Sequence, residues 1–174
     1  MSLLQFRKIE TADFHLLHKW HNQAHVKQWY DKDKDLSTLQ AVVEKYNPIL
    51  EENKPTQSYI ILSDERPIGY IQTYRINDYP DYGKHVGLTE EAAGLDLFIG
   101  DAEYLHRGLG SEIIQKFLKE IIFADTDIES CIVGPEPKNT SAIRAYEKAG
   151  FKYLKTVQLP DEPEPEYLMR IRKV

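Results

Sequence analysis

The stretch Gly94-Leu95-Asp96-Leu97-Phe98-Ile99-Gly100 is followed, after a short polar connection, by Leu105-His106-Arg107-Gly108-Leu109-Gly110-Ser111. In the first run Leu95, Leu97 and Ile99 alternate with Asp96 and Phe98, which predicts a strand with one apolar face. After the second run, apolar residues recur every four positions as far as Ile122, which predicts a helix with a broad apolar face. Strand, glycine-rich turn and helix therefore follow one another here.

The turn has the properties of a phosphate-binding segment. Gly108 and Gly110 lack a Cβ, so the backbone can turn tightly and a ligand can come close. The helix that follows begins with free amide donors and the positive end of its dipole, and Arg107 adds a formal charge. A diphosphate-bearing ligand is the natural hypothesis, although the pattern also fits an ordinary strand-to-helix turn. It matches neither the P-loop nor the dinucleotide fingerprint, which argues against ATP hydrolysis and NAD binding.

Composition narrows the class of protein. A chain of 174 residues with 41% hydrophobic content suits one globular domain. Apolar runs are too short to span a membrane, and residues 1–8 contain no secretory signal, so we expect a cytoplasmic protein. The net charge of −6 argues against nucleic acid as a partner and fits a small cationic substrate. The single cysteine, Cys131, excludes a disulfide within the chain and is expected in a buried strand.

The remaining periodic segments predict further helices and strands on both sides of this unit. Asn139 and Gly150 are placed to cap the two ends of the last helix, and Pro48 should interrupt the second one. The helices are expected over 11–20, 37–46 and 140–149, and the strands over 5–9, 58–62, 68–76, 129–133, 151–159 and 167–171.

Three polar or aromatic segments are candidates for ligand contacts. The pair Trp29-Tyr30 either covers a ligand or fills space between helix and sheet. The connection over 77–93 is rich in tyrosines and carboxylates, which suits an acceptor with hydroxyls and amines, although it fits a mobile insertion equally well. The run 161–166 contains four carboxylates that prolines hold extended. Four histidines over 15–25 lack the spacing of a metal site, so we expect them mostly solvated and expect no metal.

Taken together, the glycine-rich turn and the run Arg144–Phe151 (RAYEKAGF) after Asn139 resemble the GNAT superfamily of acetyl-CoA-dependent N-acetyltransferases. The resemblance covers essentially the whole chain. It implies an α/β (α+β) fold in which a central mixed, mostly antiparallel twisted sheet of about six to seven strands is flanked by about four helices. One departure is Leu105, since the turn of the superfamily usually opens with Gln or Arg.

Within the superfamily the chain is more similar to aminoglycoside 6'-N-acetyltransferases. The similar stretches are Trp29-Tyr30, Pro67–Tyr70, Gly94–Asp96, Tyr104-Leu105 and RAYEKAGF. The resemblance implies that Asp96 handles the acceptor amine, that Tyr146 lies by the coenzyme sulfur and that Asp161 represents the family's acidic loop. In one departure, relatives carry an Asp at the strand end where this chain has Gly134. Glu136 lies two residues further on.

These roles form a coherent reaction. An alkylammonium is not nucleophilic, so a carboxylate such as Asp96 must orient it and accept a proton, directly or through water. Backbone amides around Phe98 and Ile99 could stabilise the carbonyl oxygen, and the Tyr146 hydroxyl could protonate the departing thiolate. The expected coenzyme-binding residues are Leu97, Phe98, Ile99, His106, Arg107, Gly108, Leu109, Gly110, Ser111, Asn139, Ala142 and Tyr146. The expected acceptor-binding residues are Trp29, Tyr30, Tyr74, Tyr79, Tyr82, Asp96, Glu136 and Asp161.

The acceptor itself stays open at this point. An aminoglycoside 6'-amine is the leading hypothesis, with a metabolite, siderophore-precursor or protein amine as the alternative. A non-catalytic acyl-CoA-binding module is a third possibility, and the presence of both Asp96 and Tyr146 argues against it. Both a monomer and a homodimer fit the sequence.

Overall fold

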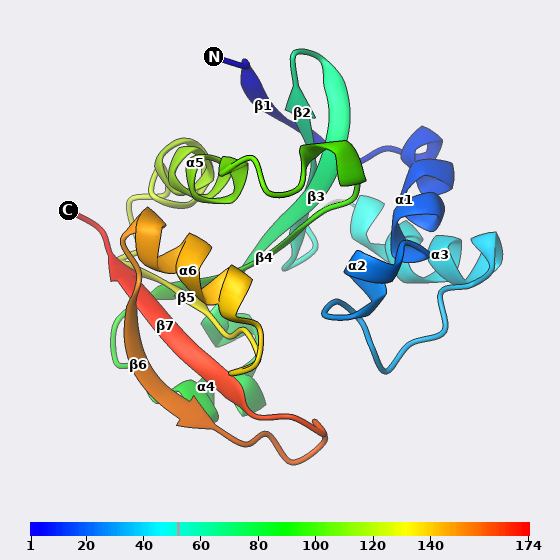
Figure 1. The fold of residues 1–174 in the computed structure, drawn as a ribbon. Coiled ribbons are helices and arrows are strands. Elements are labelled where there is room, and N and C mark those ends of the chain that lie inside the picture. Colours follow the sequence, from blue (N-terminus) through cyan, green and yellow to red (C-terminus); the bar gives the residue numbers. More distant parts are fainter. Residues whose placement is uncertain (52) are drawn as a thin grey trace. The chain divides into compact units, whose positions relative to one another are not determined.

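A computed structural model describes residues 1–51 and 53–174 of the protein. Over these residues, seven strands share one sheet in the order β1-β2-β3-β4-β5-β7-β6 (Figure 1). The strands are β1 (Leu4–Lys8), β2 (Gln57–Ser63), β3 (Arg66–Arg75), β4 (Ala92–Ile99), β5 (Ser130–Val133), β6 (Lys152–Val157) and β7 (Glu166–Arg172). Strands β4 and β5 pair in parallel, whereas β1–β2, β5–β7 and β6–β7 pair antiparallel. The sheet is therefore mixed and mostly antiparallel, as predicted.

Six α-helices accompany these strands over the described residues. They are α1 (Phe14–His21), α2 (Ala24–Lys27), α3 (Leu39–Tyr46), α4 (Pro80–Val86), α5 (Leu109–Phe117) and α6 (Thr140–Ala149). The longer helices α1, α3, α5 and α6 are the four that the sequence predicted. Helix α4 lies inside the connection that was expected to be a loop, and it begins with a proline and ends at Gly87, whose φ is +69°. None of the described helices has the length and apolar character needed to cross a membrane.

The chain forms two compact units. The N-terminal unit comprises residues 1–72 and 97–107, and the C-terminal unit comprises residues 73–96 and 108–174. Strands β3 and β4 contribute residues to both. The single domain expected from chain length stays a prediction, and each unit is described by itself.

In the N-terminal unit, helices α1, α2 and α3 lie close together (Figure 1) around a largely apolar core. Trp20 is 2% exposed and packs edge-on against Phe98, with ring centroids 6.2 Å apart. A Cβ added at Gly100 would lie 2.1 Å from Trp20 Cγ. A side chain at position 100 would therefore overlap the indole ring of Trp20, which explains why a glycine follows β4.

Capping differs slightly from the sequence prediction in this unit. The helix expected from residue 11 begins with a short 3-10 turn, Thr11–Asp13, which Glu10 caps. Asp13 accepts a hydrogen bond from the Glu10 amide at 2.8 Å and also binds both terminal nitrogens of Arg7, which stabilises this turn. The helix expected from residue 37 is α3, and its cap is Thr38, since the Thr38 hydroxyl accepts from the Ala41 amide at 3.1 Å. Helix α3 ends at Tyr46, just before Pro48, as predicted.

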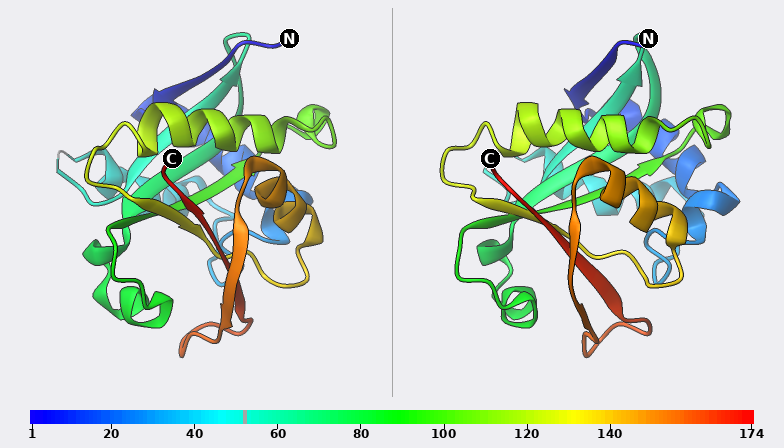
Figure 2. Two further views of the ribbon diagram at one scale, coloured as in Figure 1. Left: turned by 90° about the vertical axis from the view of Figure 1, so that its left-hand side faces the viewer. Right: turned by 60° about the vertical axis from the view of Figure 1, so that its left-hand side comes forward.

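In the C-terminal unit, α6 leads directly into the β6–β7 hairpin (Figure 2). Both ends of α6 follow the predicted chemistry: Asn139 Oδ1 accepts from the Ala142 amide at 3.2 Å, and Gly150 closes the helix at φ +108°. Phe151 folds back, with its ring centroid 5.5 Å from that of Tyr146. Helix α5 packs beside α6 and ends at Phe117, after which Leu118–Ile122 forms a π-helical turn in place of the continuous helix expected to Ile122.

Strand β4 is covered on both of its faces, so the prediction of one apolar face was wrong. Leu95 is 1% exposed and Phe98 is 7% exposed, and residues three apart in a strand point to opposite sides. Leu97 and Ile99 are only half-buried. The burial of Leu95 and Phe98 shows that other parts of the chain cover both faces of this strand, so the alternation in the sequence does not separate a buried face from an exposed one.

Candidate active site

Asp96 lies at the centre of a group of ionisable side chains in the C-terminal unit. Its negative charge helps to raise the pKa of five neighbours, in each case together with burial as the largest cause. These neighbours are Tyr74, Tyr82, Cys131, Tyr146 and Glu166. The structure thus brings together Asp96, Tyr146, Tyr74 and Tyr82, which the sequence had placed in one site from segments far apart in the chain.

Tyr146 combines a packed ring with a hydroxyl that is available to a ligand. The residue is 7% exposed and its ring packs against Phe151. Among the described residues no hydrogen bond reaches its hydroxyl. Burial, with Asp96 as the second cause, raises the pKa of Tyr146 well above its usual value, so the group stays protonated at neutral pH. Tyr146 is therefore present as the protonated hydroxyl, the form that can donate a hydrogen bond or a proton to a leaving thiolate.

Tyr74 and Tyr79 form an aromatic wall of this group. A Cβ at Gly94 would lie 2.3 Å from Tyr74 Cζ, so the absence of a side chain at Gly94 makes room for the Tyr74 ring. The Tyr79 ring stands nearly perpendicular to that of Tyr74, with centroids 5.2 Å apart, and Tyr79 is 39% exposed. Aromatic faces of this kind pack against sugar rings and alkylammonium groups.

Glu166, the first residue of β7, joins this group although the sequence analysis did not select it. Tyr82 in α4 donates a hydrogen bond to Glu166 Oε2 at 2.9 Å. Burial raises the pKa of Glu166 to about 7, the Tyr82 hydrogen bond opposes this shift, and the charges of Asp96 and Glu162 add to it. The acidic run 161–166 pointed to this region, but nothing in the sequence distinguishes Glu166 from the other three carboxylates of the run.

Asp161 and Glu136, the two other carboxylates expected to bind the acceptor, are not among the residues described above around Asp96. Asp161 is exposed and, within the part of the chain that the structure describes, makes no hydrogen bond or ion pair. Glu136 is half-buried in the turn after β5, where its carbonyl oxygen accepts from the Asn139 amide at 2.9 Å. Their roles in acceptor binding stay predictions. The predicted burial of Cys131 in a strand is confirmed, since it is 0% exposed in β5.

In the N-terminal unit, the two residues of the Trp29-Tyr30 pair behave differently. The Tyr30 ring packs edge-on against Phe98 at 4.8 Å and against Tyr70 at 6.4 Å, which supports the interpretation that this ring fills space between helix and sheet. Trp29 is half-buried, and the Lys32 ammonium lies over its ring at 5.8 Å from the centroid. Trp29 is therefore the better candidate of the two for a ligand contact.

The expectation that the early histidines are mostly solvated was wrong for His21. This side chain is 3% exposed, and its Nε2 lies 2.5 Å from the Tyr46 hydroxyl. His25 Nε2 lies 2.9 Å from the carbonyl oxygen of Ile99. Exposed and buried positions alternate along this short helix, so the sequence alone did not show that His21 is on the buried side. Over the described residues, no group of three or more His, Cys, Asp or Glu side chains could hold a metal.

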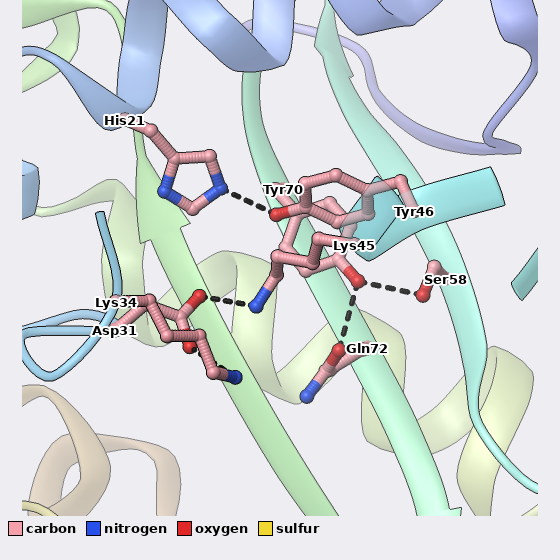
Figure 3. Close-up of polar contacts among 8 residues, drawn as sticks. All are labelled: His21, Asp31, Lys34, Lys45, Tyr46, Ser58, Tyr70 and Gln72. Carbon is pink, nitrogen blue, oxygen red and sulfur yellow. Dashed lines mark hydrogen bonds and ion pairs between the residues drawn. The ribbon is translucent and has the colours of Figure 1, made fainter. Parts of the chain in front are cut away.

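His21 is part of a polar network inside the N-terminal unit (Figure 3). Asp31 forms ion pairs with Lys45 and, at 3.2 Å, with Lys34. The Tyr70 hydroxyl contacts Ser58 Oγ at 2.6 Å and donates to Gln72 Oε1 at 2.8 Å. Buried polar groups that are satisfied in this way fix side-chain positions, so we assign the network a structural role.

Protonation of His21 should destabilise the protein in mild acid. Burial lowers the pKa of His21 to about 4 from 6.5, and the charge of Asp31 opposes this only in part. Between these pH values the unfolded state binds more protons than the folded state. As the pH is lowered, the free energy of unfolding should therefore fall by up to about 1.4 kcal/mol per pH unit. Urea denaturation at pH 7.5, 6 and 5 measures the slope. His21→Gln should show a shallower slope than the wild type, and equal slopes would contradict the assignment.

The glycine-rich turn has a backbone shape suited to an anion. His106 and Gly108 have φ values of +58° and +74°, with Arg107 between them at negative φ. Such alternation points neighbouring amides into one concavity. Helix α5 begins immediately afterwards at Leu109, and the Arg107 guanidinium lies over the Tyr104 ring at 5.1 Å. The predicted diphosphate-binding residues 106–111 therefore have the right local form.

The two glycines of the turn should differ in their sensitivity to substitution. Gly108 has a left-handed φ with open space around it, so Gly108→Ala should cost about 1–2 kcal/mol of stability and weaken coenzyme binding. A Cβ at Gly110 would lie 3.4 Å from Ala145 Cβ, which is a normal packing distance, so Gly110→Ala should reduce the stability much less. Urea denaturation and calorimetric titration with coenzyme A measure the two effects. A larger loss in Gly110→Ala would refute this interpretation.

Local contacts position several of the other residues that are expected to bind the coenzyme. Phe98 is one of them: a Cβ at Gly69 would lie 2.4 Å from its carbonyl oxygen, so the absence of a side chain at Gly69 allows the two backbones to approach closely near the end of β4. Asn139 and Ala142 bind one another in the α6 cap, which leaves a coenzyme contact from Asn139 a prediction. Ser111 Oγ lies 3.4 Å from the Gly108 carbonyl oxygen and braces the first turn of α5.

Comparison with known proteins identifies the family. The family described as Acetyltransferase (GNAT) domain matches residues 10–159. Aminoglycoside N(6')-acetyltransferase type 1 of Klebsiella pneumoniae is 32% identical over 167 residues, which cover 96% of this chain and 82% of that protein. The kanamycin resistance protein of Rhizobium radiobacter is 38% identical over 80 residues, or 46% of this chain and 72% of that protein. The chain therefore belongs to the GNAT acetyltransferase family.

Solved structures agree with this assignment. The structure of the aminoglycoside acetyltransferase AAC(6')-Ib with ribostamycin and coenzyme A has a TM-score of 0.82 and 29% identity, covering 98% of this chain and 93% of that one. Its complex with coenzyme A and kanamycin has a TM-score of 0.81 and 29% identity, covering 98% and 95%. An uncharacterised protein from Bacillus halodurans, 22% identical, shares the fold with a TM-score of 0.85 over 98% and 84% of the two chains. The protein is an acetyl-CoA-dependent N-acetyltransferase, as predicted.

Proposed function

We propose that the protein transfers the acetyl group of acetyl-CoA to the 6'-amino group of an aminoglycoside. The observation that carries the proposal is the clustering of Asp96 with Glu166 and with the hydroxyls of Tyr74, Tyr82 and Tyr146. Carboxylates attract the ammonium groups of an amino sugar, and tyrosines supply partners for its hydroxyls. The similarity to AAC(6')-Ib, crystallised with ribostamycin and with kanamycin, supports the same acceptor class.

In the proposed reaction, Asp96 orients the acceptor ammonium and takes its proton, directly or through water. The neutral amine then attacks the thioester carbonyl, and the amides of Phe98 and Ile99 stabilise the negative charge that develops on its oxygen. Tyr146 donates its proton to the sulfur as the carbon–sulfur bond breaks, so that coenzyme A leaves as a thiol. The second proton of the attacking nitrogen is released as the amide forms, and it returns to the Tyr146 oxygen and restores the hydroxyl. The turn 106–111 binds the diphosphate, and Asn139 binds the pantetheine arm.

A second candidate keeps the reaction and changes the acceptor to another amine. Gly134 favours it, because the resemblance places a carboxylate of the aminoglycoside enzymes at this strand end. Such an acceptor would be a metabolite, a siderophore precursor or a protein amine.

Thiol release from acetyl-CoA separates these candidates. Neomycin and paromomycin form a matched pair of acceptors, since they differ in carrying an amino or a hydroxyl group at the 6' position. Saturable turnover of neomycin without turnover of paromomycin is the expected result. Turnover of polyamines or amino acids alone, with acetyl-CoA bound normally, would replace the aminoglycoside with the second candidate.

A further inference from the structure

The position of Glu166 is determined by the absence of a side chain on the neighbouring strand. A Cβ added at Gly134 would lie 2.4 Å from Glu166 Oε2 and 3.0 Å from its Cδ. Strands β5 and β7 pair antiparallel up to Val133 and Met169, and the Tyr167 amide continues the pairing by donating to the Pro135 carbonyl at 2.8 Å. The carboxylate of Glu166 therefore lies in the space that a side chain at Gly134 would occupy.

Over the residues that the structure describes, no cation compensates the charge of this carboxylate. Its hydrogen bond comes from the neutral Tyr82 hydroxyl of α4, at 2.9 Å. The other ionisable groups that act on it or respond to it are Asp96 of β4, Glu162 of the preceding loop and Tyr74 of β3, each neutral or negative. Within the described residues no Lys, Arg or His pairs with Glu166. Glu164, two residues earlier, is instead paired with Lys138 at 3.5 Å.

We propose that Glu166 is a specificity-determining residue that binds a second ammonium group of the acceptor, while Asp96 receives the amine that reacts. This inference rests on the proposed function and deepens it. A half-buried carboxylate gains a strong charge-assisted hydrogen bond from an ammonium, and the hydrogen bond from the Tyr82 hydroxyl holds the carboxylate in place. The acceptor class is therefore one with at least two amines, and single amines should not gain from Glu166.

The ionisation of Glu166 supports this assignment. Burial, with Asp96 and Glu162 as further causes, raises the pKa of Glu166 to about 7. The carboxylate is thus partly protonated at neutral pH without ligand and becomes ionised when a cation binds. Affinity for a polycationic acceptor should rise with pH through about 7, and replacing Glu166 by Gln should remove this rise.

The test compares Glu166→Gln with the matched control Glu164→Gln. Calorimetric titration of the enzyme–coenzyme A complex uses kanamycin B as the polycation and 6-amino-6-deoxyglucose as the single-ammonium probe. In Glu166→Gln the Kd of kanamycin B should rise about tenfold, the size of one lost charge-assisted hydrogen bond, and that of the probe less than about twofold. In steady state the acceptor KM should rise with kcat nearly unchanged. Glu164→Gln should behave as the wild type.

A carboxylate swap adds a readout that a purely structural role would not give. In the double variant Glu166→Ala with Gly134→Asp, the new carboxylate should occupy the same space and restore much of the kanamycin B affinity lost in Glu166→Ala alone. Unchanged kanamycin B affinity in Glu166→Gln, an equal loss for the probe, or no rescue by the swap would overturn the proposal.

The two proposals can fail separately. If the wild type acetylates aminoglycosides and Glu166→Gln has an unchanged acceptor KM, the role of Glu166 is refuted and the function stands. If the wild type acetylates no aminoglycoside, the function is refuted, and titration with spermine decides the role of Glu166. A tenfold loss of spermine affinity in Glu166→Gln would then support the second-ammonium site. Equal affinities of the wild type and Glu166→Gln for spermine, or no binding of spermine to the wild type, would reject it.

Discussion

Replacing Asp96 by Asn should lower kcat by about 10²–10⁴-fold, the range typical of a lost general base. An amide keeps the shape and can still accept a hydrogen bond, but it cannot take the proton of the acceptor ammonium. The loss should therefore appear in kcat with the KM for acetyl-CoA little changed. The deficit should shrink as the pH rises toward the pKa of the acceptor amine, because the neutral amine then forms without the enzyme.

Steady-state thiol release measured between pH 6 and 9.5 tests this prediction. Asp81→Asn is a suitable control, because Asp81 lies in α4 of the same unit and its side chain is fully exposed, at 100%. A kcat for Asp96→Asn within about threefold of the wild type would remove Asp96 from the chemistry. A rise in KM alone would make it a binding residue.

Tyr146→Phe should lower kcat by about 10²-fold or more, because the departing thiolate loses its proton donor. The ring should stay where it is, since it packs against Phe151 and its hydroxyl has no hydrogen bond among the described residues. The melting temperature should therefore change little. The pairing of a large kinetic loss with an unchanged stability is the signature that separates a proton donor from a packing residue.

Kinetics and thermal denaturation of the same preparation measure both effects. Tyr153→Phe provides the control, because Tyr153 is 54% exposed and its hydroxyl contacts Thr156 at 3.1 Å. If Tyr146→Phe keeps the wild-type kcat, the sulfur is protonated by another group or by water. If it loses stability in proportion to activity, its role is packing.

Much of the fold could be predicted because its signals are local. The cap at Asn139, the turn at Gly108 and the helix end at Gly150 each depend on one residue type and a few neighbours. Helix α4 was missed because its seven residues are too few for a periodic apolar pattern, although Pro80 and Gly87 mark its ends. The prediction that β4 has one apolar face was wrong because the residues that bury its two faces are distant in sequence.

The residues of the candidate site show the same difference between local sequence signals and contacts that depend on distant segments. Asp96 and Tyr146 could be chosen from motifs, whereas Glu166 depends on strand register, since only the pairing of β5 with β7 brings it to Gly134. His21 looked like one of several surface histidines, and its burial against Tyr46 follows from how α1 and α3 pack. Contacts of this kind join segments that are distant in sequence, so they could not be predicted from local sequence patterns.

The burial of Cys131 gives the enzyme a convenient property at the bench. It is the one cysteine of the chain, it is 0% exposed, and burial together with the charge of Asp96 raises the pKa of its thiol well above the usual range. A thiol reagent added to the folded enzyme should therefore report only the coenzyme A that the reaction releases. The same reagent should count one thiol per molecule once the protein unfolds, so a single dye can follow turnover in one experiment and unfolding of each variant in the next.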